Sequence, residues 1–320
     1  MNLHIGSRGS QLALWQANHI AALLRGQGHS VEIEIIKTTG DRLQEIAFAE
    51  VGSKGMFTKE IEEALAAGRI DLAVHSLKDL PTELPGPFAL AATPRRADPR
   101  DAFVSVRYEN LASLPLGARV GTCSQRRRAQ LKALRADIEA VEFRGNVDTR
   151  LRKLAEGQVD AILLAGAGLD RLEKTEWVRE RLDPRDFCPA AGQGALGIET
   201  RKIDAATIAA VAFLDDAETR FTVTVERVAL AALGGGCQVP IGLHCRPEIE
   251  SGAPSISRSL RNGWEIFAVV AAPETGAAVR VYHRASRSGS DPVALGQLAA
   301  HMLLEAGAGP LLQASGGAPK

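Results

Sequence analysis

The sequence lacks any apolar run long enough to span a bilayer. Its first residues lack the basic stretch, apolar core and small-residue cleavage site of a secretory signal. It has no net charge either, because 38 basic residues are matched by 38 acidic ones. These absences argue against an exported, membrane-bound or general nucleic-acid-binding protein. We therefore expect a cytoplasmic chain with no membrane and no nucleic-acid partner.

Motifs for metals and phosphates are missing as well. The four cysteines show no C-x-x-C spacing, so we expect thiols rather than disulfides, and no metal site. Neither G-x-x-x-x-G-K-[ST] nor G-x-G-x-x-G occurs in a strand–helix context. This argues against a third possibility that we considered, an enzyme that acts on a phosphorylated substrate.

The first half of the chain alternates between strand and helix patterns, which predicts a mostly parallel sheet covered by helices. The proline-rich residues 81–101 interrupt the alternation and predict a crossover between two lobes. From about residue 217 the pattern changes to a helix, two strands and a helix, with a frayed tail after 306. The predicted strands cover 2–6, 31–35, 70–76, 118–122, 138–143, 159–165, 264–271 and 278–284, and the helices 11–25, 58–67, 124–135, 148–156, 217–232 and 292–306.

The two lobes resemble each other in sequence. ALAAGRIDLAV, around Gly68 and Asp71, is similar to KLAEGQVDAIL, around Gly157 and Asp160. We therefore predict two similar α/β lobes that face each other, followed by a smaller α+β domain.

Two residues, Cys237 and Asp79, are candidates for a catalytic or ligand-binding role. Cys237 lies in LGGGCQVPIG, where glycines leave room for the sulfur to reach a ligand, and a thiolate is a strong nucleophile. The alternative is a small buried residue beside a tight turn. Asp79, in VHSLKDLP, follows a buried strand, and ligands bind at the carboxyl ends of strands in such sheets. The alternative for Asp79 is an exposed turn residue paired with Lys78.

Basic residues concentrate in one part of this neutral chain. Between Arg119 and Lys153 there are ten Arg or Lys and four Asp or Glu. Arg126 and Arg127 open a predicted helix after GTCS, a place that suits carboxylates or phosphates. Arg144 ends a predicted strand, and Arg8 occupies the matching place in the first lobe. A solvated helix face explains Arg128 and Lys132 but explains Arg144 poorly.

Nine segments together resemble the porphobilinogen deaminase family. They are SRGSQLALWQA, VGSKGMFTKEIEEAL, DLAVHSLKDLPTELP, DPRDAF, GTCSQRRRAQL, FRGNVDTRL, AGLDRL, PAAGQGALGIE and GGGCQVPIG, in the family's order over residues 5–245. The resemblance implies a transferase of heme and tetrapyrrole biosynthesis that condenses four porphobilinogen molecules and releases hydroxymethylbilane. It also implies a dipyrromethane cofactor, one per chain, bonded covalently to Cys237.

The resemblance further implies roles for individual residues. Asp79 would hold pyrrole N–H groups and stabilise positive charge, with Lys78 and Arg8 beside it as catalytic residues. Lys54 and Phe57 match a loop that covers the site. The remaining cofactor- and substrate-binding positions of the family match Arg126, Arg127, Arg144, Arg150, Arg171, Ser10, Ser76, Thr122 and Ser124. Glu50, Cys123 and Gly234 depart from the family's usual residues, which changes details of the loops but removes none of the catalytic groups.

The implied fold is α/β, with two lobes like those of type II periplasmic binding proteins and a smaller C-terminal α+β domain. We expect residues 1–95 and 195–212 in the first lobe, 100–190 in the second and 217–320 in the third domain, in a monomer. A different class shares the two-lobe fold, namely a protein that binds an anionic solute or senses an effector. Such a protein needs cleft arginines but no activated thiol in a glycine-rich loop.

Overall fold

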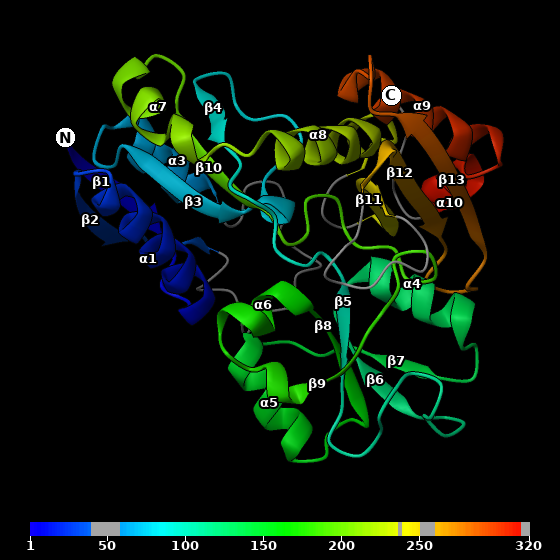
Figure 1. Cartoon of the computed structure of the whole chain (residues 1–320). Coiled ribbons are helices and arrows are strands. Elements are labelled where there is room, and N and C mark those ends of the chain that lie inside the picture. The colour runs from blue at the N-terminus through cyan, green and yellow to red at the C-terminus, as the bar shows by residue number, and fades with distance from the viewer. Residues whose placement is uncertain (40–57, 236–238, 250–259, 315–320) are drawn as a thin grey trace.

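The computed structural model describes residues 1–39, 58–235, 239–249 and 260–314. Within these ranges the strands form two five-stranded sheets and one three-stranded sheet. Figure 1 shows the first sheet at the upper left, the second at the bottom and the three-stranded sheet at the upper right. No helix in the described ranges is long and apolar enough to cross a membrane.

The first sheet has the order β2-β1-β3-β10-β4. β1, β2 and β3 run parallel, but β10 runs antiparallel to both β3 and β4, so the predicted mostly parallel sheet is in fact mixed. β4 lies inside the proline-rich stretch in which we predicted only a crossover. The strands are β1 Asn2–Ser7, β2 Ser30–Ile35, β3 Leu72–Ser76, β4 Phe88–Ala92 and β10 Leu196–Arg201.

The second sheet repeats this plan with the order β7-β6-β8-β5-β9. β6 runs parallel to β7 and β8, whereas β5 runs antiparallel to both β8 and β9. The strands are β5 Asp101–Val104, β6 Arg119–Gly121, β7 Glu139–Val141, β8 Ala161–Ala165 and β9 Val178–Arg181. Each lobe therefore places three parallel strands next to an antiparallel one.

Matching hydrogen bonds confirm the internal similarity that the sequence predicted. The Asp71 carboxylate accepts from the His4 backbone N–H at 2.8 Å, and the Asp160 carboxylate accepts from that of Arg119 at 2.8 Å. Gly68 and Gly157, three residues earlier in each lobe, both have positive φ angles, of 69° and 77°. Glycine adopts that conformation without the steric cost that a side chain brings.

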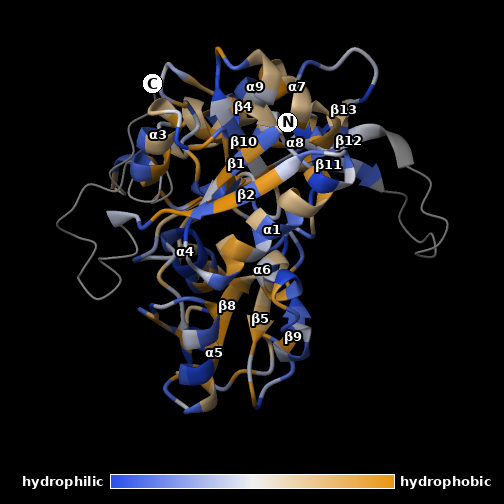
Figure 2. Cartoon of the chain, turned by 90° about the vertical axis from the view of Figure 1, so that its left-hand side faces the viewer, coloured by the Kyte–Doolittle hydropathy of each residue, from blue (hydrophilic) through white to orange (hydrophobic). Residues whose placement is uncertain are grey.

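Helices cover the apolar strands of both lobes. In Figure 2 β5 and β8 are largely hydrophobic, whereas much of α4 and α5 is hydrophilic. Ser10 caps the first helix by accepting from Ala13 N–H, and Asn146 caps α5 in the same way through Thr149 N–H. The helices are α1 Gln11–Gly26, α3 Lys59–Ala66, α4 Gln125–Leu134, α5 Val147–Ala155, α6 Gly166–Arg171 and α7 Ala205–Val211.

The last part of the chain packs helices against the three-stranded antiparallel sheet β11-β12-β13. Its first helix matches the predicted residues, but the strand β11 was not predicted. The tail that we expected to fray after 306 contains a short helix, α10, which buries Leu312. The elements are α8 Ala217–Ala232, β11 Ile241–Ile249, β12 Leu260–Ala271, β13 Ala278–Ser286, α9 Pro292–Glu305 and α10 Gly309–Ala314.

A buried ion pair joins this last part to the lobes. Glu226 of α8 accepts two hydrogen bonds from the Arg96 guanidinium, at 2.7 and 3.0 Å, and one from Gly192 N–H at 2.7 Å. Arg96 and Gly192 lie in the two segments that connect the lobes. His244 Nδ1 lies 3.3 Å from the same carboxylate, whose side chain is 1% exposed. We call Arg96, Glu226 and His244 the joint cluster.

Candidate active site

The first lobe gathers its predicted site residues at one edge of its sheet. β1 and β3 are parallel neighbours, so their carboxyl ends meet at the same edge. Arg8 and Ser10 follow β1, and Ser76 ends β3, where its hydroxyl accepts from Gln16 Nε2 at 2.8 Å. Arg8 is half-buried and has a contact in the structure.

Lys78 and Asp79 extend this edge. They lie in a single 3-10 turn, Leu77–Asp79, that directly follows β3. Leu77 anchors the turn, because its side chain is fully buried and its N–H donates to Ala195 O at 3.0 Å. Asp79 is exposed, whereas Lys78 is half-buried. The turn therefore presents a carboxylate to solvent and directs an amine inward.

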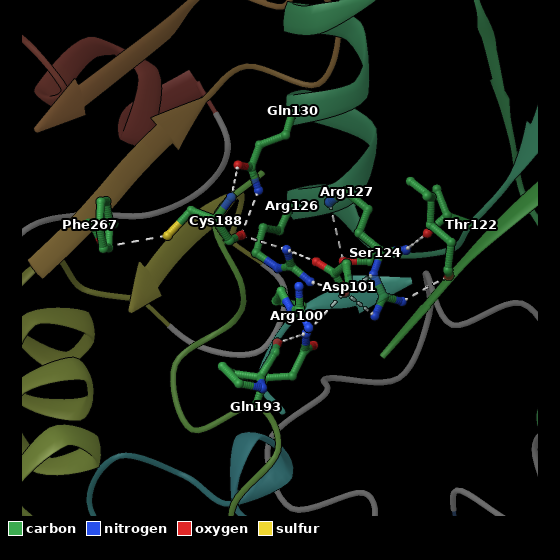
Figure 3. Close-up of polar contacts among 12 residues, drawn as sticks. Arg100, Asp101, Thr122, Ser124, Arg126, Arg127, Gln130, Cys188, Gln193 and Phe267 are labelled. Atoms are coloured by element: carbon green, nitrogen blue, oxygen red, sulfur yellow. Dashed lines mark hydrogen bonds and ion pairs between the residues drawn. The ribbon is translucent and has the colours of Figure 1, made fainter. Parts of the chain in front are cut away.

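The second lobe gathers its own residues at the equivalent edge. Thr122 directly follows β6, and its hydroxyl accepts from Ser124 N–H at 3.2 Å. Ser124 caps α4 by accepting from Arg127 N–H. The cap starts the helix so that the second and third residues of α4, Arg126 and Arg127, follow at once (Figure 3).

Both guanidinium groups contact one buried carboxylate, that of Asp101. Arg126 reaches it at 2.6 and 3.2 Å, and Arg127 at 2.7 and 3.0 Å. Gln193 Nε2 donates to the same carboxylate at 3.0 Å. Burial alone would raise the pKa of Asp101, but Arg126 and Arg127 outweigh that effect and hold its pKa far below the usual range. We call Asp101, Arg126 and Arg127 the cleft cluster; Figure 3 shows its contacts.

Lys78 brings the first lobe into the electrostatic field of the cleft cluster. Burial lowers the pKa of Lys78 most, the negative charges of Asp79 and Asp101 oppose that effect, and the positive charges of Arg127 and Arg126 lower it further. The predicted residues Lys78, Arg126 and Arg127, which are far apart in the sequence, therefore lie close enough to interact.

Arg144 and Arg150 lie beyond β7 in the same lobe. The Arg144 Nε donates to Glu142 at 2.6 Å, so its charge is already partly offset. Arg150 Nη2 lies 3.4 Å from the sulfur of Cys123, and its buried Nε has no hydrogen-bond partner. A buried donor without a partner is costly and indicates a place where a ligand acceptor belongs.

Arg171 lies between the lobes rather than with the other arginines. It ends α6, donates to Gly194 O at 2.7 Å and lies 5.8 Å from the centre of the Trp15 ring in α1. Burial lowers the pKa of Arg171 to about 10, although the neighbouring Asp170 opposes the shift. The structure therefore gives this predicted ligand residue contacts with both lobes.

The glycine-rich loop is described up to Gly235. Gly234 has a φ of 68°, and Gly234 and Gly235 N–H donate to Ala231 O and Leu230 O, which closes the end of α8. A glycine therefore suits the position at which the chain departs from the family's glutamate. The predicted residues Cys237, Lys54, Phe57 and Glu50 lie outside the described residues.

Two residues of this site were missed from the sequence. Asp101 occurs in the quoted segment DPRDAF, and Gln193 in the quoted segment PAAGQGALGIE, but neither residue was given a role. The available signal was a charged residue opening the apolar run AFV, which is common enough to mean little alone. Their partners lie 25 and 92 residues away along the chain, so only the fold reveals the contacts.

Known families match almost the whole chain. The family model "Porphobilinogen deaminase, dipyromethane cofactor binding domain" matches residues 3–209, and "Porphobilinogen deaminase, C-terminal domain" matches residues 220–305. The porphobilinogen deaminase of Roseiflexus castenholzii is 47% identical over 315 residues, which cover 97% of this chain and 98% of that protein. That of Nitratidesulfovibrio vulgaris (strain DSM 19637 / Miyazaki F) is 54% identical over 244 residues, 76% of this chain and 77% of that protein.

The chain belongs to the porphobilinogen deaminase family. Membership confirms the predicted transferase activity and the predicted dipyrromethane cofactor. It also confirms the predicted fold class, two α/β lobes with a smaller C-terminal domain.

Solved solute-binding proteins are distantly similar to this chain. The L-cystine solute receptor of Neisseria gonorrhoeae, in its unliganded open conformation, is 14% identical with a TM-score of 0.38. The match covers 74% of this chain and 94% of the receptor. A similarity with so low a TM-score carries no argument, and the family matches give the solute-binding alternative no support.

The donor set fits the cofactor of the porphobilinogen deaminase family. Each pyrrole unit carries an acetate and a propionate, which need cationic or hydroxyl donors. The second lobe offers such donors in Thr122, Ser124, Arg127 and Arg150, and the buried Nε of Arg150 has no hydrogen-bond acceptor within the protein. In the described part of the chain, no group of three His, Cys, Asp or Glu side chains could hold a metal ion.

Proposed function

We propose that this chain performs the porphobilinogen deaminase reaction at the edge where Lys78, Asp79, Arg126 and Arg127 lie. It would condense four porphobilinogen molecules one at a time, with loss of ammonia, and release hydroxymethylbilane by hydrolysis. The observation that carries this assignment is the exposed carboxylate of Asp79 next to Lys78, whose amine interacts with the arginines of the other lobe. The dipyrromethane, attached to Cys237, would supply the end to which the first substrate is joined.

The arginines would bind the acid groups of the cofactor and the growing product. Arg127, Arg144 and Arg150 come from α4 and from the region after β7, so they offer donors along one edge of the second sheet. Arg8, Ser10 and Ser76 lie at the carboxyl edge of the first sheet, and Thr122 and Ser124 add hydroxyl or backbone donors. Planar guanidinium groups pair with carboxylates through two parallel hydrogen bonds, which suits a ligand rich in acid groups. Arg171, from α6, and Lys54 would add further cations to the site.

Asp79 would act on the reacting ring itself. Its ionised carboxylate can accept the pyrrole N–H and stabilise the positive charge that develops as ammonia leaves. A carboxylate that stabilises the transition state more than the bound substrate affects kcat more than KM.

Asp79→Asn tests this role, because it keeps the shape of the side chain and removes its charge. We expect kcat to fall on the order of 100- to 1,000-fold, with KM nearly unchanged. Glu83→Gln, a neutralised and exposed acid four residues further on, is the matched control and should behave like the wild type. Turnover of Asp79→Asn within a few-fold of the wild type would remove Asp79 from the mechanism.

Three further properties belong to the same proposal. We expect a cytoplasmic monomer whose partner is porphobilinogen and which binds neither nucleic acid nor membranes, because the chain has no net charge to attract polyanions. Light scattering of the purified protein measures the oligomeric state, and a stable dimer would contradict the monomer.

We also propose the domain boundaries given above, with 1–95 and 195–212 in one lobe, 100–190 in the other and 217–320 in the third domain.

A further inference from the structure

Asp101 is a buried acid to which the proposed reaction assigns no role. It opens β5, and its side chain is fully buried. Its contacts come from different parts of the chain: Arg126 and Arg127 of α4, and Gln193 of the segment that returns to the first lobe. Gln193 also donates to Pro99 O at 2.7 Å, which fixes the amide in place.

The charges around Asp101 do not balance. One carboxylate faces two guanidinium groups, and Lys78, which lies within electrostatic reach, is accompanied by the negative charge of its neighbour Asp79. Burying a charge is costly unless an opposite charge compensates for it. Asp101 therefore offsets part of the positive charge of the cleft cluster and leaves a surplus that suits the acid groups of a ligand.

The contacts of Asp101 also fix where the two guanidinium groups lie. Arg126 is tied to the Asp101 carboxylate and to Cys188 O at 2.7 Å, and Arg127 to the carboxylate and to Leu163 O at 3.2 Å. Without the carboxylate two like charges would repel each other inside the protein, and they would bind acid groups of a ligand more strongly.

We propose that Asp101 is a positioning residue that fixes Arg126 and Arg127 for the acid groups of the cofactor and product and limits how tightly they hold them. This inference rests on the proposed function. The growing product gains acid groups with every unit but must still move and finally leave. Asp101 keeps the affinity of Arg126 and Arg127 for these acid groups low enough for the product to move along the site and to be released.

Asp101→Asn tests the proposal, because the amide has the shape of the acid without its charge. We expect KM and kcat each to fall by about tenfold, since product acid groups bind more tightly and leave more slowly. Intact mass spectra recorded after substrate is exhausted should show chains that still carry added pyrrole units. A merely structural role would reduce the active fraction with wild-type KM and a wild-type mass pattern, and that result would overturn the proposal.

Two variants serve as controls. Asp98→Asn removes a carboxylate just before β5 that pairs with Arg100 and Arg181, and it should leave KM and the mass pattern unchanged. Asp101→Glu keeps the negative charge, so it should not accumulate bound chains, and accumulation there would contradict the role of charge. A wild-type chain at its bare sequence mass would instead contradict the proposed function, so the two failures are distinguishable.

The thermal midpoint of Asp101→Asn gives a readout without turnover. In a Cys237→Ser background, where no cofactor can attach, citrate should raise the midpoint of Asp101→Asn more than sodium chloride of the same ionic strength does. In the Cys237→Ser variant that keeps Asp101, the thermal midpoints in citrate and in sodium chloride should differ less. If Asp101→Asn is insoluble in plain buffer, citrate must restore its soluble yield better than chloride. Equal effects of the two salts would overturn the proposal.

Discussion

Two buried clusters of arginine and carboxylate in the described part of the chain differ in charge balance. In the joint cluster, Glu226 faces one guanidinium, that of Arg96, and its remaining contacts are backbone N–H groups and His244. In the cleft cluster, Asp101 faces two guanidinium groups, with Lys78 near them. Burial alone would raise the pKa of Glu226, but Arg96 lowers it below the usual value. The balanced cluster holds the parts of the chain together, and the unbalanced one has positive charge left for a ligand.

The largest effect on stability should come from the joint cluster. Glu226→Gln leaves the Arg96 charge buried without its partner, and we expect the free energy of unfolding to fall by about 3–5 kcal/mol. Urea unfolding followed by circular dichroism measures it. Glu218→Gln, in the first turn of the same helix, removes an exposed partner of Arg287 and should cost about 1 kcal/mol or less. Equal losses in the two variants would contradict a structural role for the joint cluster.

The opposite pattern is expected of the cleft cluster. Arg127→Gln leaves Asp101 paired with Arg126, so stability should fall less than in Glu226→Gln, while activity should fall on the order of 100-fold. Steady-state rates and the fraction of chains with a cofactor adduct measure the effect. Arg128→Gln is the control, because that neighbouring guanidinium donates to Ala140 O. If Arg127→Gln has wild-type activity and a wild-type fraction of chains with the cofactor, the cleft cluster does not bind the ligand and does not differ from the joint cluster in function.

The smallest effect concerns pH and the joint cluster. Burial lowers the pKa of His244 below 6.5, although Glu226 opposes the shift. The unfolded chain therefore takes up a proton near pH 6.5 that the folded chain refuses, so stability falls as the pH drops below that value. The loss should reach about 1 kcal/mol at pH 5.5 relative to pH 7.5. Urea unfolding at both pH values measures this loss, and in His244→Asn the loss should be smaller by about that amount. A loss as large as in the wild type would contradict the role of His244.

The sequence predicted elements whose pattern is local. The helix α8 begins after its cap Asp216 and ends before Gly234, both readable from neighbouring residues. β4 was missed because prolines surround it and because its partner, β10, arrives about a hundred residues later. β11 was missed because Pro247 and the polar residues around it hide the alternation, and pairing with β12 makes it a strand.

The functional site likewise has residues that local sequence predicts and residues that only the folded structure identifies. Arg126 and Arg127 could be found because a capped helix start followed by arginines is a local signal. Their partner Asp101, and the balance of charge that it sets, depend on contacts that the folded chain creates. Residue types therefore indicated an anion-binding cleft, whereas the distances showed which cations are already paired.

The central claim, a pyrrole cofactor attached to Cys237 and held by surplus positive charge, can be tested most directly by weighing the purified chain. We predict that intact-mass measurement of the wild type gives the sequence mass plus two linked pyrrole units. The Cys237→Ser variant, purified in parallel, should have the mass of its sequence alone. A fully active wild-type chain at its bare sequence mass would contradict the account.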